Sequence, residues 1–348
     1  MLYAGAKRED TILVNADIQR SNRSRLLFFL HIVIAFLAVL SIFALTNSEL
    51  IEQRKIYISL LLIEGVLALI NHHFTQTRPF LLNLTIELFL SSLLIYGIIL
   101  GVFLNPTEYS TSFVAFILTL PILFLRRPIV AIAQILLFVS LFIFLVVQVE
   151  SPNVVFGDVL NATVFGAGSI VLSTYIMKTM MQNQILKFKT ARIANEDQLT
   201  GLLNRNCYET QLKNYPSLCT KTLSCIYIDV NGLHTLNNQK GLEAGDKMLR
   251  FIAKEFQMRF GKNHTYRIGG DEYVAFAMDS NNSTIAQKIQ KCVQQVKSQN
   301  YHVACGYFTA PAENLDISEL IKSAESNMYT AKSEYYSKFG VAQRGFRE

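Results

Sequence analysis

The chain has 348 residues, of which 51% are hydrophobic and only 17% are charged, and its formal net charge is +6. This composition is too apolar for an ordinary soluble enzyme, and the chain is too long for one small domain. The apolar excess lies between Leu27 and about Met180, whereas the sequence from about Gln182 onward is of ordinary mixed composition. The sequence therefore predicts two parts that meet near residue 180.

The first part predicts an all-α polytopic membrane bundle of about six helices. A helix that crosses a membrane needs about 20 mainly apolar residues. Candidate spans lie at about 26–46, 56–72, 80–103, 112–126, 129–149 and 155–180. The first span is too long for a signal-peptide core, so we expect it to stay as an anchor. The predicted organisation is an arm at 1–25 and a transmembrane sensory region at 26–180.

Basic residues indicate the orientation of this bundle. They cluster in the arm, between the fourth and fifth spans and after the sixth span, as Arg20, Arg23, Arg25, Arg126, Arg127, Lys178, Lys187 and Lys189. The positive-inside rule then places both termini in the cytoplasm. Arg54 and Lys55 beside the second span conflict mildly with this orientation. The positive charge therefore indicates cytoplasmic loops, and we expect no nucleic-acid partner.

Several polar side chains fall inside the predicted spans, namely Glu64, Asn83, Glu87, Gln134, Asp158 and Asn161. Acids inside a membrane often mark ligand or ion paths. The same groups can also form hydrogen bonds between helices, and the sequence leaves both interpretations open. A transporter would use such acids too, but no repeated pair of broken helices is evident. The sensed ligand cannot be named from the sequence.

Residues 181–196 predict a helix that links the two parts. Met181, Ile185 and Phe188 lie at positions i, i+4 and i+7, which form one apolar stripe on a polar helix. Such a helix can join two subunits as a short coiled coil or lie on the surface of a domain. All five cysteines follow this helix, and none forms a C-x-x-C pair. We therefore expect reduced thiols and no zinc site.

The second part predicts strands that alternate with helices, as in an α/β or α+β domain. The stretch LSCIYIDVNG, Leu223 to Gly232, predicts a buried strand that ends in a turn. HTYRI and EYVAFAM predict two strands joined by Gly269-Gly270, a pair that is favoured in two-residue hairpins. HVACGYF predicts another strand, and DISELIKSAESNMYTAK predicts a helix that Asp316 caps.

Acidic residues gather at the predicted tip of this hairpin. Asp271 and Glu272 follow Gly269 and Gly270, and Asp229 ends a separate strand. Three carboxylates from neighbouring strands would repel one another unless a cation joined them. Hard oxygen ligands beside glycines that admit a phosphate suit Mg²⁺ bound with a nucleoside triphosphate. A hairpin with surface acids is the alternative that this motif alone leaves open.

Four motifs follow one another along this part of the chain, namely DQLTGLLNR (Asp197–Arg205), DVNGLHTLNNQKGLEAGD (Asp229–Asp246), RIGGDEY (Arg267–Tyr273) and AESNMYTAK (Ala324–Lys332). In this order they resemble the GGDEF family, the diguanylate cyclases. The resemblance covers roughly residues 197–337 and predicts a GGDEF domain over 197–348. It implies an α/β, palm-like fold of the nucleotide cyclases.

The resemblance also implies the reaction. Two GTP molecules, one on each subunit of a homodimer, are joined into cyclic di-GMP, and pyrophosphate is expelled. It implies that Asp229, the Val230 carbonyl, Asp271 and Glu272 hold Mg²⁺ or Mn²⁺, and that Asp271 or Glu272 helps deprotonate the 3′-hydroxyl. With the apolar spans, it implies a multi-pass protein of a bacterial inner membrane, partnered by the lipid bilayer and an unknown cyclic di-GMP effector.

The family pattern further implies which residues bind the substrate. Asn237 and Asp246 match the residues that bind guanine, and a carboxylate suits the N1–H and N2–H₂ donors that adenine lacks. Lys332 matches a lysine that contacts the phosphates, and Gly269 and Gly270 leave room for them.

The chain departs from the family pattern at several positions, namely Asn231, His234, Asn238, Leu242, Tyr273 and Tyr336. His234 and Tyr336 replace two cations that face the phosphates in the family. Such cations stabilise the charge that builds up during phosphoryl transfer, so their loss puts the rate in doubt. The sequence therefore favours a membrane-anchored diguanylate cyclase, and leaves open a degenerate module that binds GTP or a partner and relays a membrane signal.

Overall fold

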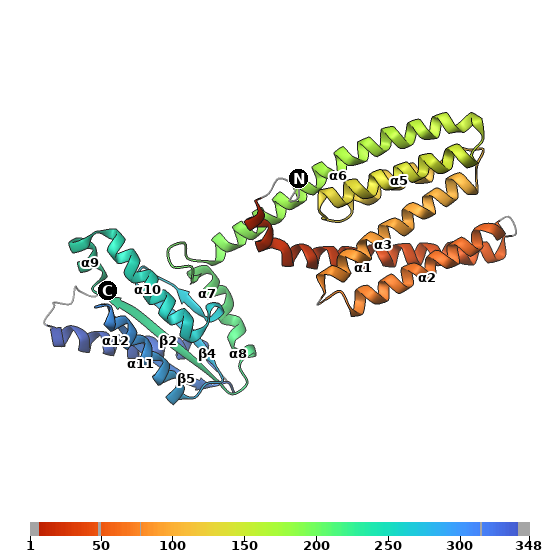
Figure 1. Ribbon diagram of the computed structural model, residues 1–348. Helices are drawn as coiled ribbons and strands as arrows, with labels where there is room; N and C mark the ends of the chain where they lie inside the picture. The colour runs from red at the N-terminus through yellow and green to blue at the C-terminus, as the bar shows by residue number, and fades with distance from the viewer. Residues whose placement is uncertain (1–6, 48–49, 77, 314, 340–348) are drawn as a thin grey trace. The chain divides into compact units, whose positions relative to one another are not determined.

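The computed structural model describes residues 7–47, 50–76, 78–313 and 315–339. The chain forms two compact units, Met1–Phe188 and Lys189–Glu348 (Figure 1), which we call the helical unit and the C-terminal unit. The boundary lies inside the predicted linker helix, 181–196.

In the described residues of the helical unit, all regular secondary structure is helical. The helices are α1 (Arg8–Thr46), α2 (Ile51–His73), α3 (Pro79–Ile98), which continues as a π-helical turn (Ile99–Phe103), α4 (Thr111–Thr119), which continues as a 3₁₀ turn (Leu120–Ile122), α5 (Pro128–Val149) and α6 (Pro152–Asn195). Among the described residues, five helices are long and apolar enough to cross a membrane. The fourth predicted span corresponds to the shorter apolar segment Thr111–Ile122. Most of the predicted arm is helical, because α1 begins at Arg8.

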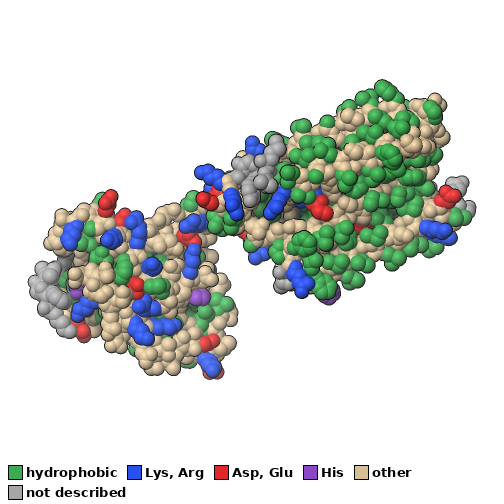
Figure 2. All heavy atoms as spheres, viewed as in Figure 1, with side chains coloured by type: hydrophobic (Ala, Val, Ile, Leu, Met, Phe, Trp, Pro, Cys, Tyr) green, Lys and Arg blue, Asp and Glu red, His purple; other side chains and the backbone are tan. Residues whose placement is uncertain are grey.

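Large apolar side chains lie both inside and outside this unit. Figure 2 shows apolar side chains over the visible face of the helical unit, and Phe28, Phe36 and Leu62 are 61%, 59% and 65% exposed. The inside is also apolar, with Leu90, Phe113 and Phe142 fully buried. A helical bundle that is apolar on both its inner and outer faces is typical of a membrane-embedded protein.

The C-terminal unit contains one five-stranded sheet in the order β1-β3-β4-β2-β5. The strands are β1 (Leu203–Asn204), β2 (Thr222–Asn231), β3 (Thr265–Arg267), β4 (Glu272–Met278) and β5 (His302–Pro311). β1 pairs with β3 in parallel, and the other pairs are antiparallel. The sheet is therefore mixed, and the predicted α/β class is correct for this unit.

Helices cover both faces of the sheet (Figure 1). They are α7 (Arg205–Gln211), α8 (Tyr215–Leu218), α9 (Leu233–Lys240), α10 (Leu242–Phe260), α11 (Asn282–Ser298) and α12 (Ile317–Phe339). Apolar side chains of α10 and α11 pack with Ile226 and Ile228 of β2. Those of α7, α8 and α12 pack with Cys225 and Tyr227 of the same strand. Because neighbouring residues of a strand point to opposite faces, β2 is buried on both sides.

The hairpin that carries the motif RIGGDEY (Arg267–Tyr273), which we call the signature, differs from its prediction. Arg267 pairs with Tyr273 in the β3–β4 register, and the Ile268 N–H donates to the Glu272 carbonyl at 3.0 Å. The connection between the strands is therefore residues 268–271, so the predicted two-residue Gly269-Gly270 turn is wrong. Neither glycine has a φ in the left-handed region, which a tight two-residue turn would need.

Candidate functional site

Two carboxylates lie side by side at one end of the central strands. Asp229 of β2 and Glu272 of β4 are direct partners in the antiparallel register. Both share a face with Tyr227, the face that α12 covers. Directly opposed residues of a strand pair have Cβ atoms about 5 Å apart. The fold thus brings together two of the three predicted acids, which are far apart in the chain.

Lys332 completes this cluster from the other layer. Its Nζ donates to Asp229 Oδ2 at 2.6 Å, and only 5% of the Asp229 side chain is exposed. The close packing of α12 on β5 makes this reach possible. A Cβ atom at Gly306 of β5 would collide with the backbone at Ala324 and Met328 of α12. Gly306 therefore supports the site, and no sequence pattern signals this contact between layers.

The pKa values of the cluster reflect burial and crowding. Burial raises the pKa of the Asp229 carboxyl, and the bond from Lys332 only partly offsets this effect. Burial also raises the pKa of Glu272, and the Asp229 and Asp271 carboxylates raise it further. Burial alone would lower the pKa of Lys332, but its bond to Asp229 and the nearby acids raise it. Perturbed pKa values in one cluster are typical of functional sites.

The oxygen atoms around Asp229 show whether these residues fit the predicted metal. Asp229 Oδ1 is buried and has no hydrogen-bond partner. Such an oxygen is costly unless a cation or a donor binds it. The two facing carboxylates and the Val230 carbonyl are hard oxygen donors of the kind that Mg²⁺ prefers. Within the described residues, however, no group of three or more acidic, His or Cys side chains is arranged to hold a metal. The residues thus fit a cation at Asp229 and Glu272, and the role of Asp271 as a third acidic ligand stays a prediction.

The signature loop is held in shape by one arginine. Arg267 Nη2 donates to the Gly270 carbonyl at 2.6 Å, and its Nη1 donates to Asp197 Oδ1 at 2.9 Å. The loop is also tied to β2, because the Val230 N–H donates to the Asp271 carbonyl at 3.0 Å. A Cβ at Gly269 would lie 2.8 Å from Glu272 Oε2, whereas a Cβ at Gly270 would meet nothing within 4 Å. The two glycines therefore have different surroundings.

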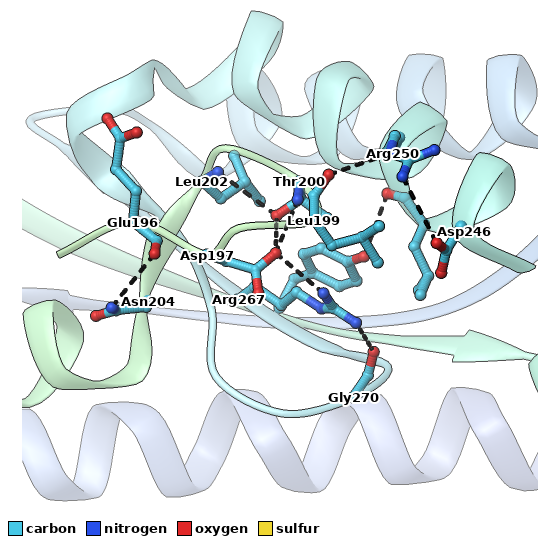
Figure 3. Close-up of polar contacts among 12 residues, drawn as sticks. Glu196, Asp197, Leu199, Thr200, Leu202, Asn204, Asp246, Arg250, Arg267 and Gly270 are labelled. Atoms are coloured by element: carbon cyan, nitrogen blue, oxygen red, sulfur yellow. Dashed lines mark hydrogen bonds and ion pairs between the residues drawn. The ribbon is translucent and has the colours of Figure 1, made fainter. Parts of the chain in front are cut away.

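Asp197 belongs to the first family motif, and Figure 3 shows how it meets the signature loop. Its Oδ1 accepts from both the N–H and the hydroxyl of Thr200, at 2.8 and 2.6 Å. Gly201 follows with a φ of +71°, and the Asp197 N–H closes the turn onto the Leu202 carbonyl at 2.8 Å. The motif thus builds a tight turn whose carboxylate receives Arg267. The sequence alone matched this motif to the family but assigned no function to its residues.

The predicted guanine-binding residues are also neighbours. Asn237 lies on α9, and its Oδ1 is buried without a hydrogen-bond partner. This oxygen lies against Gly245, where a Cβ would collide with it. Asp246 is the next residue, and its carboxylate is 43% exposed and 3.5 Å from Arg250 (Figure 3). Because Gly245 has no side chain, the Asn237 amide oxygen can approach Asp246. Gly245 was not among the predicted site residues.

The departures from the family pattern have distinct surroundings. Asn231 lies on the same face of β2 as Asp229 and is 3% exposed, yet neither polar atom of its amide has a partner. His234 Nδ1 is 3.1 Å from the Asn238 amide nitrogen on α9. Tyr273 is fully buried, and its hydroxyl donates to the Leu249 carbonyl at 3.2 Å. The fold thus accommodates tyrosine at this signature position by giving its hydroxyl an acceptor.

Comparison with known proteins places this region in a family. Residues 194–337 match the family described as "Diguanylate cyclase, GGDEF domain". Cyclic di-GMP phosphodiesterase PdeB of Shewanella oneidensis is 31% identical over 175 residues, which are 47% of this chain and 20% of that protein. A diguanylate cyclase of Vibrio cholerae is 27% identical over 161 residues, which are 42% of this chain and 49% of that protein. The chain thus matches less than half of the length of either relative.

Two solved structures are similar to part of this chain. The coiled coil and GGDEF domain of DgcB from Caulobacter crescentus, in complex with c-di-GMP, has a TM-score of 0.42 and 17% identity. The match covers 47% of this chain and 95% of the DgcB chain. The GGEEF domain of a diguanylate cyclase from Vibrio cholerae has a TM-score of 0.31 and 24% identity, and covers 37% of this chain and 85% of that one. With the family match and its four motifs, residues 194–337 are a GGDEF domain of the diguanylate cyclase family.

Proposed function

We propose that the chain is a diguanylate cyclase anchored in a bacterial cytoplasmic membrane, which condenses two GTP molecules into cyclic di-GMP and two pyrophosphate ions. The observation that carries this proposal is the pairing of the buried Asp229 with the partly buried Glu272, in which the Asp229 Oδ1 atom has no hydrogen-bond partner. A module that only binds a protein partner has no need for such a pair, whose burial is costly.

Each residue of the site has a role in the proposed reaction. Asp229, Glu272, the Val230 carbonyl and Asp271 would hold Mg²⁺ or Mn²⁺, which supplies positive charge to the phosphate oxygens when bound. Asn237 and Asp246 bind the guanine edge, and Gly269 and Gly270 let the backbone approach the phosphates.

The bond-forming step needs two subunits. The 3′-hydroxyl oxygen of each GTP attacks the α-phosphorus of the other, and each pyrophosphate leaves as the new phosphodiester forms. Glu272 or Asp271 accepts the hydroxyl proton. The raised pKa of Glu272 brings this carboxyl closer to neutral pH, which favours proton transfer. Lys332, which neutralises Asp229 in the structure, turns to the phosphates when the cation binds.

The helical unit is proposed to span the membrane and to regulate the cyclase. Its five long apolar helices and its exposed apolar side chains support insertion. The basic residues at one end of the predicted spans support a cytoplasmic GGDEF domain.

A degenerate module that binds GTP without turnover is the second candidate. It is favoured by His234 and Tyr336, which stand where the family has cations facing the phosphates. Both candidates bind GTP, so only product formation separates them.

The test uses the full chain in detergent with GTP and Mg²⁺, and the product is identified by mass. We expect cyclic di-GMP from the unmodified chain and none from Glu272→Gln. Glu334→Gln, an exposed acid of α12, is the matched control and should keep its activity. Bound GTP that is recovered unchanged from the unmodified chain would establish the degenerate module instead.

A further inference from the structure

The helical unit contains a cavity of about 810 Å³ that is independent of the GGDEF domain. It is lined by α1, the first turns of α3, the segment before α5 and one residue of α6. Ligand sites in proteins typically have volumes of about 300–1,000 Å³. The cavity is therefore large enough for a small organic molecule.

Arg126 is a buried charged group at this cavity. Its side chain is only 5% exposed, and its Nη1 donates to Glu87 Oε2 at 2.7 Å and to Gln134 Oε1 at 2.9 Å. Its Nε and Nη2 atoms are buried and have no hydrogen-bond partner. A guanidinium has five N–H donors, and unpaired buried donors are costly. Arg126 thus has donors left for a planar anion.

The position of Arg126 is fixed by its neighbours. Asn22 of α1 donates to the Leu125 carbonyl at 2.9 Å and accepts from the Leu125 N–H at 3.1 Å. Gln134, which holds Nη1, in turn donates to Ser91 of α3 at 3.1 Å. These contacts hold the arginine at the cavity on a rigid support, as binding sites require.

The charge around the cavity favours an anion. Arg8 and Arg127 line it together with Arg126, whereas Glu87 is the acid that the described lining contains. The helices α3 and α5 both begin at this cavity, at Pro79 and Pro128. A helix N-terminus carries a partial positive charge. Three cations and two helix N-termini thus outweigh one carboxylate that is already paired.

Most of the rest of the wall is apolar, although the polar side chains of Thr11, Asn15, Gln19 and Asn83 also line it. The apolar part consists mainly of the side chains Ile12, Ile18, Phe80, Leu84, Leu125 and Val130. A small hydrophilic anion would leave this surface without a partner, and a neutral hydrocarbon would leave Arg126 without one. The cavity therefore matches a molecule that has both an acidic head and an alkyl chain.

We propose that this cavity binds one anionic amphiphile, whose carboxylate or phosphate head pairs with Arg126 and whose alkyl chain lies along the apolar wall. Free fatty acids and anionic phospholipids share this chemistry. The proposal is independent of the cyclase reaction, because it concerns the helical unit alone.

The test measures equilibrium binding of radiolabelled palmitate to the full chain in a non-ionic detergent. We expect one saturable site, from which hexadecyl phosphate displaces palmitate. Hexadecanol, which has the same chain and no charge, should need at least a tenfold higher concentration, and inorganic phosphate should not compete. Displacement by phosphatidylglycerol assigns the site to membrane lipid, and displacement by single-chain acids alone assigns it to free fatty acids. Both results support the proposal.

Two variants separate the head-group contact from the chain contact. Arg126→Gln combined with Glu87→Gln removes both buried charges together and should weaken palmitate at least tenfold while leaving hexadecanol unchanged. Leu84→Trp keeps every charge, fills the cavity and should weaken both ligands. Arg20→Gln, an 84% exposed arginine outside the cavity lining, is the control. Equal binding of palmitate and hexadecanol, or palmitate binding that neither variant changes, would overturn the proposal.

Discussion

At the scale of single residues, Glu272 shows a conflict between stability and the proposed chemistry. Burial and the neighbouring Asp229 and Asp271 carboxylates raise its pKa above the ordinary value of 4.5. The folded domain therefore binds this proton more tightly than the unfolded chain does. By linkage, stability falls as the pH rises from the ordinary pKa through the raised one, and it stays lower above that interval. A charged Glu272 destabilises the fold where its charge is needed.

Glu272→Gln is therefore expected to abolish turnover and to stabilise the domain at neutral pH. Hydrogen exchange of β4 should be slower in the variant than in the unmodified full chain, measured with a chelator present. The difference should vanish at a pH well below 4.5, where both side chains are neutral in both states. Faster exchange in the variant at pH 7 would show that the charged Glu272 stabilises β4, the opposite of what its raised pKa requires.

Asp246 provides a second test at this scale. Asp246→Ala removes the carboxylate expected to accept from guanine, so GTP should bind roughly tenfold more weakly. ATP lacks these donors, so its affinity should change little and the gap between the two nucleotides should narrow. Equilibrium dialysis with both nucleotides checks this expectation, with Glu243→Gln on the same helix as the control. An equal loss of affinity for ATP and GTP would mean that Asp246 does not read the base.

At the scale of elements, the packing of α12 on β5 decides where Lys332 lies. Gly306 has no side chain, so the helix backbone at Ala324 and Met328 approaches the strand directly. Backbone atoms cannot rotate away as a flexible side chain can. An added methyl group must therefore move the helix as a whole.

Gly306→Ala should destabilise the C-terminal unit by about 1–3 kcal/mol, the usual cost of overpacking. It should also lower cyclase activity, because a displaced α12 carries Lys332 away from the proposed phosphate site. Urea denaturation followed by fluorescence of the tyrosines gives the first quantity, and cyclic di-GMP formation gives the second. Gly168→Ala, which meets nothing within 4 Å, is the control for a harmless substitution. Unchanged stability in Gly306→Ala would mean that the two layers adapt to the methyl group.

At the scale of the whole molecule, the sequence predicted the elements better than the contacts between them. The mainly apolar stretch that begins at Leu223 and ends in a turn at Gly232 located β2 and placed Asp229 near its end. The hairpin turn was predicted wrongly, because its length depends on the register of Arg267 with Tyr273. The contacts at Gly245 and Gly306 were not predicted, because they join segments that only the fold brings together.

The proposed reaction also makes a prediction about assembly. Each GGDEF domain holds one GTP, so two domains must face each other. The isolated segment 189–348 should show activity per subunit that rises steeply with protein concentration. Fusing it to a dimeric coiled coil should raise its activity at low concentration, because pairing becomes nearly intramolecular. Constant activity per subunit in a proven monomer, measured by light scattering, would exclude a reaction between subunits.

The two adjacent glycines of the signature have one further consequence, which concerns evolution. A side chain at position 269 would lie 2.8 Å from Glu272 Oε2 and 3.3 Å from its Cβ, so the Glu272 carboxylate of the proposed site would have to shift to admit it. Position 270 is open within the protein, so only a bound nucleotide would penalise a larger residue there. In lineages that abandon the nucleotide, mutations should therefore accumulate at position 270 before position 269. The order of loss among descendants of such a domain would record when the substrate ceased to matter.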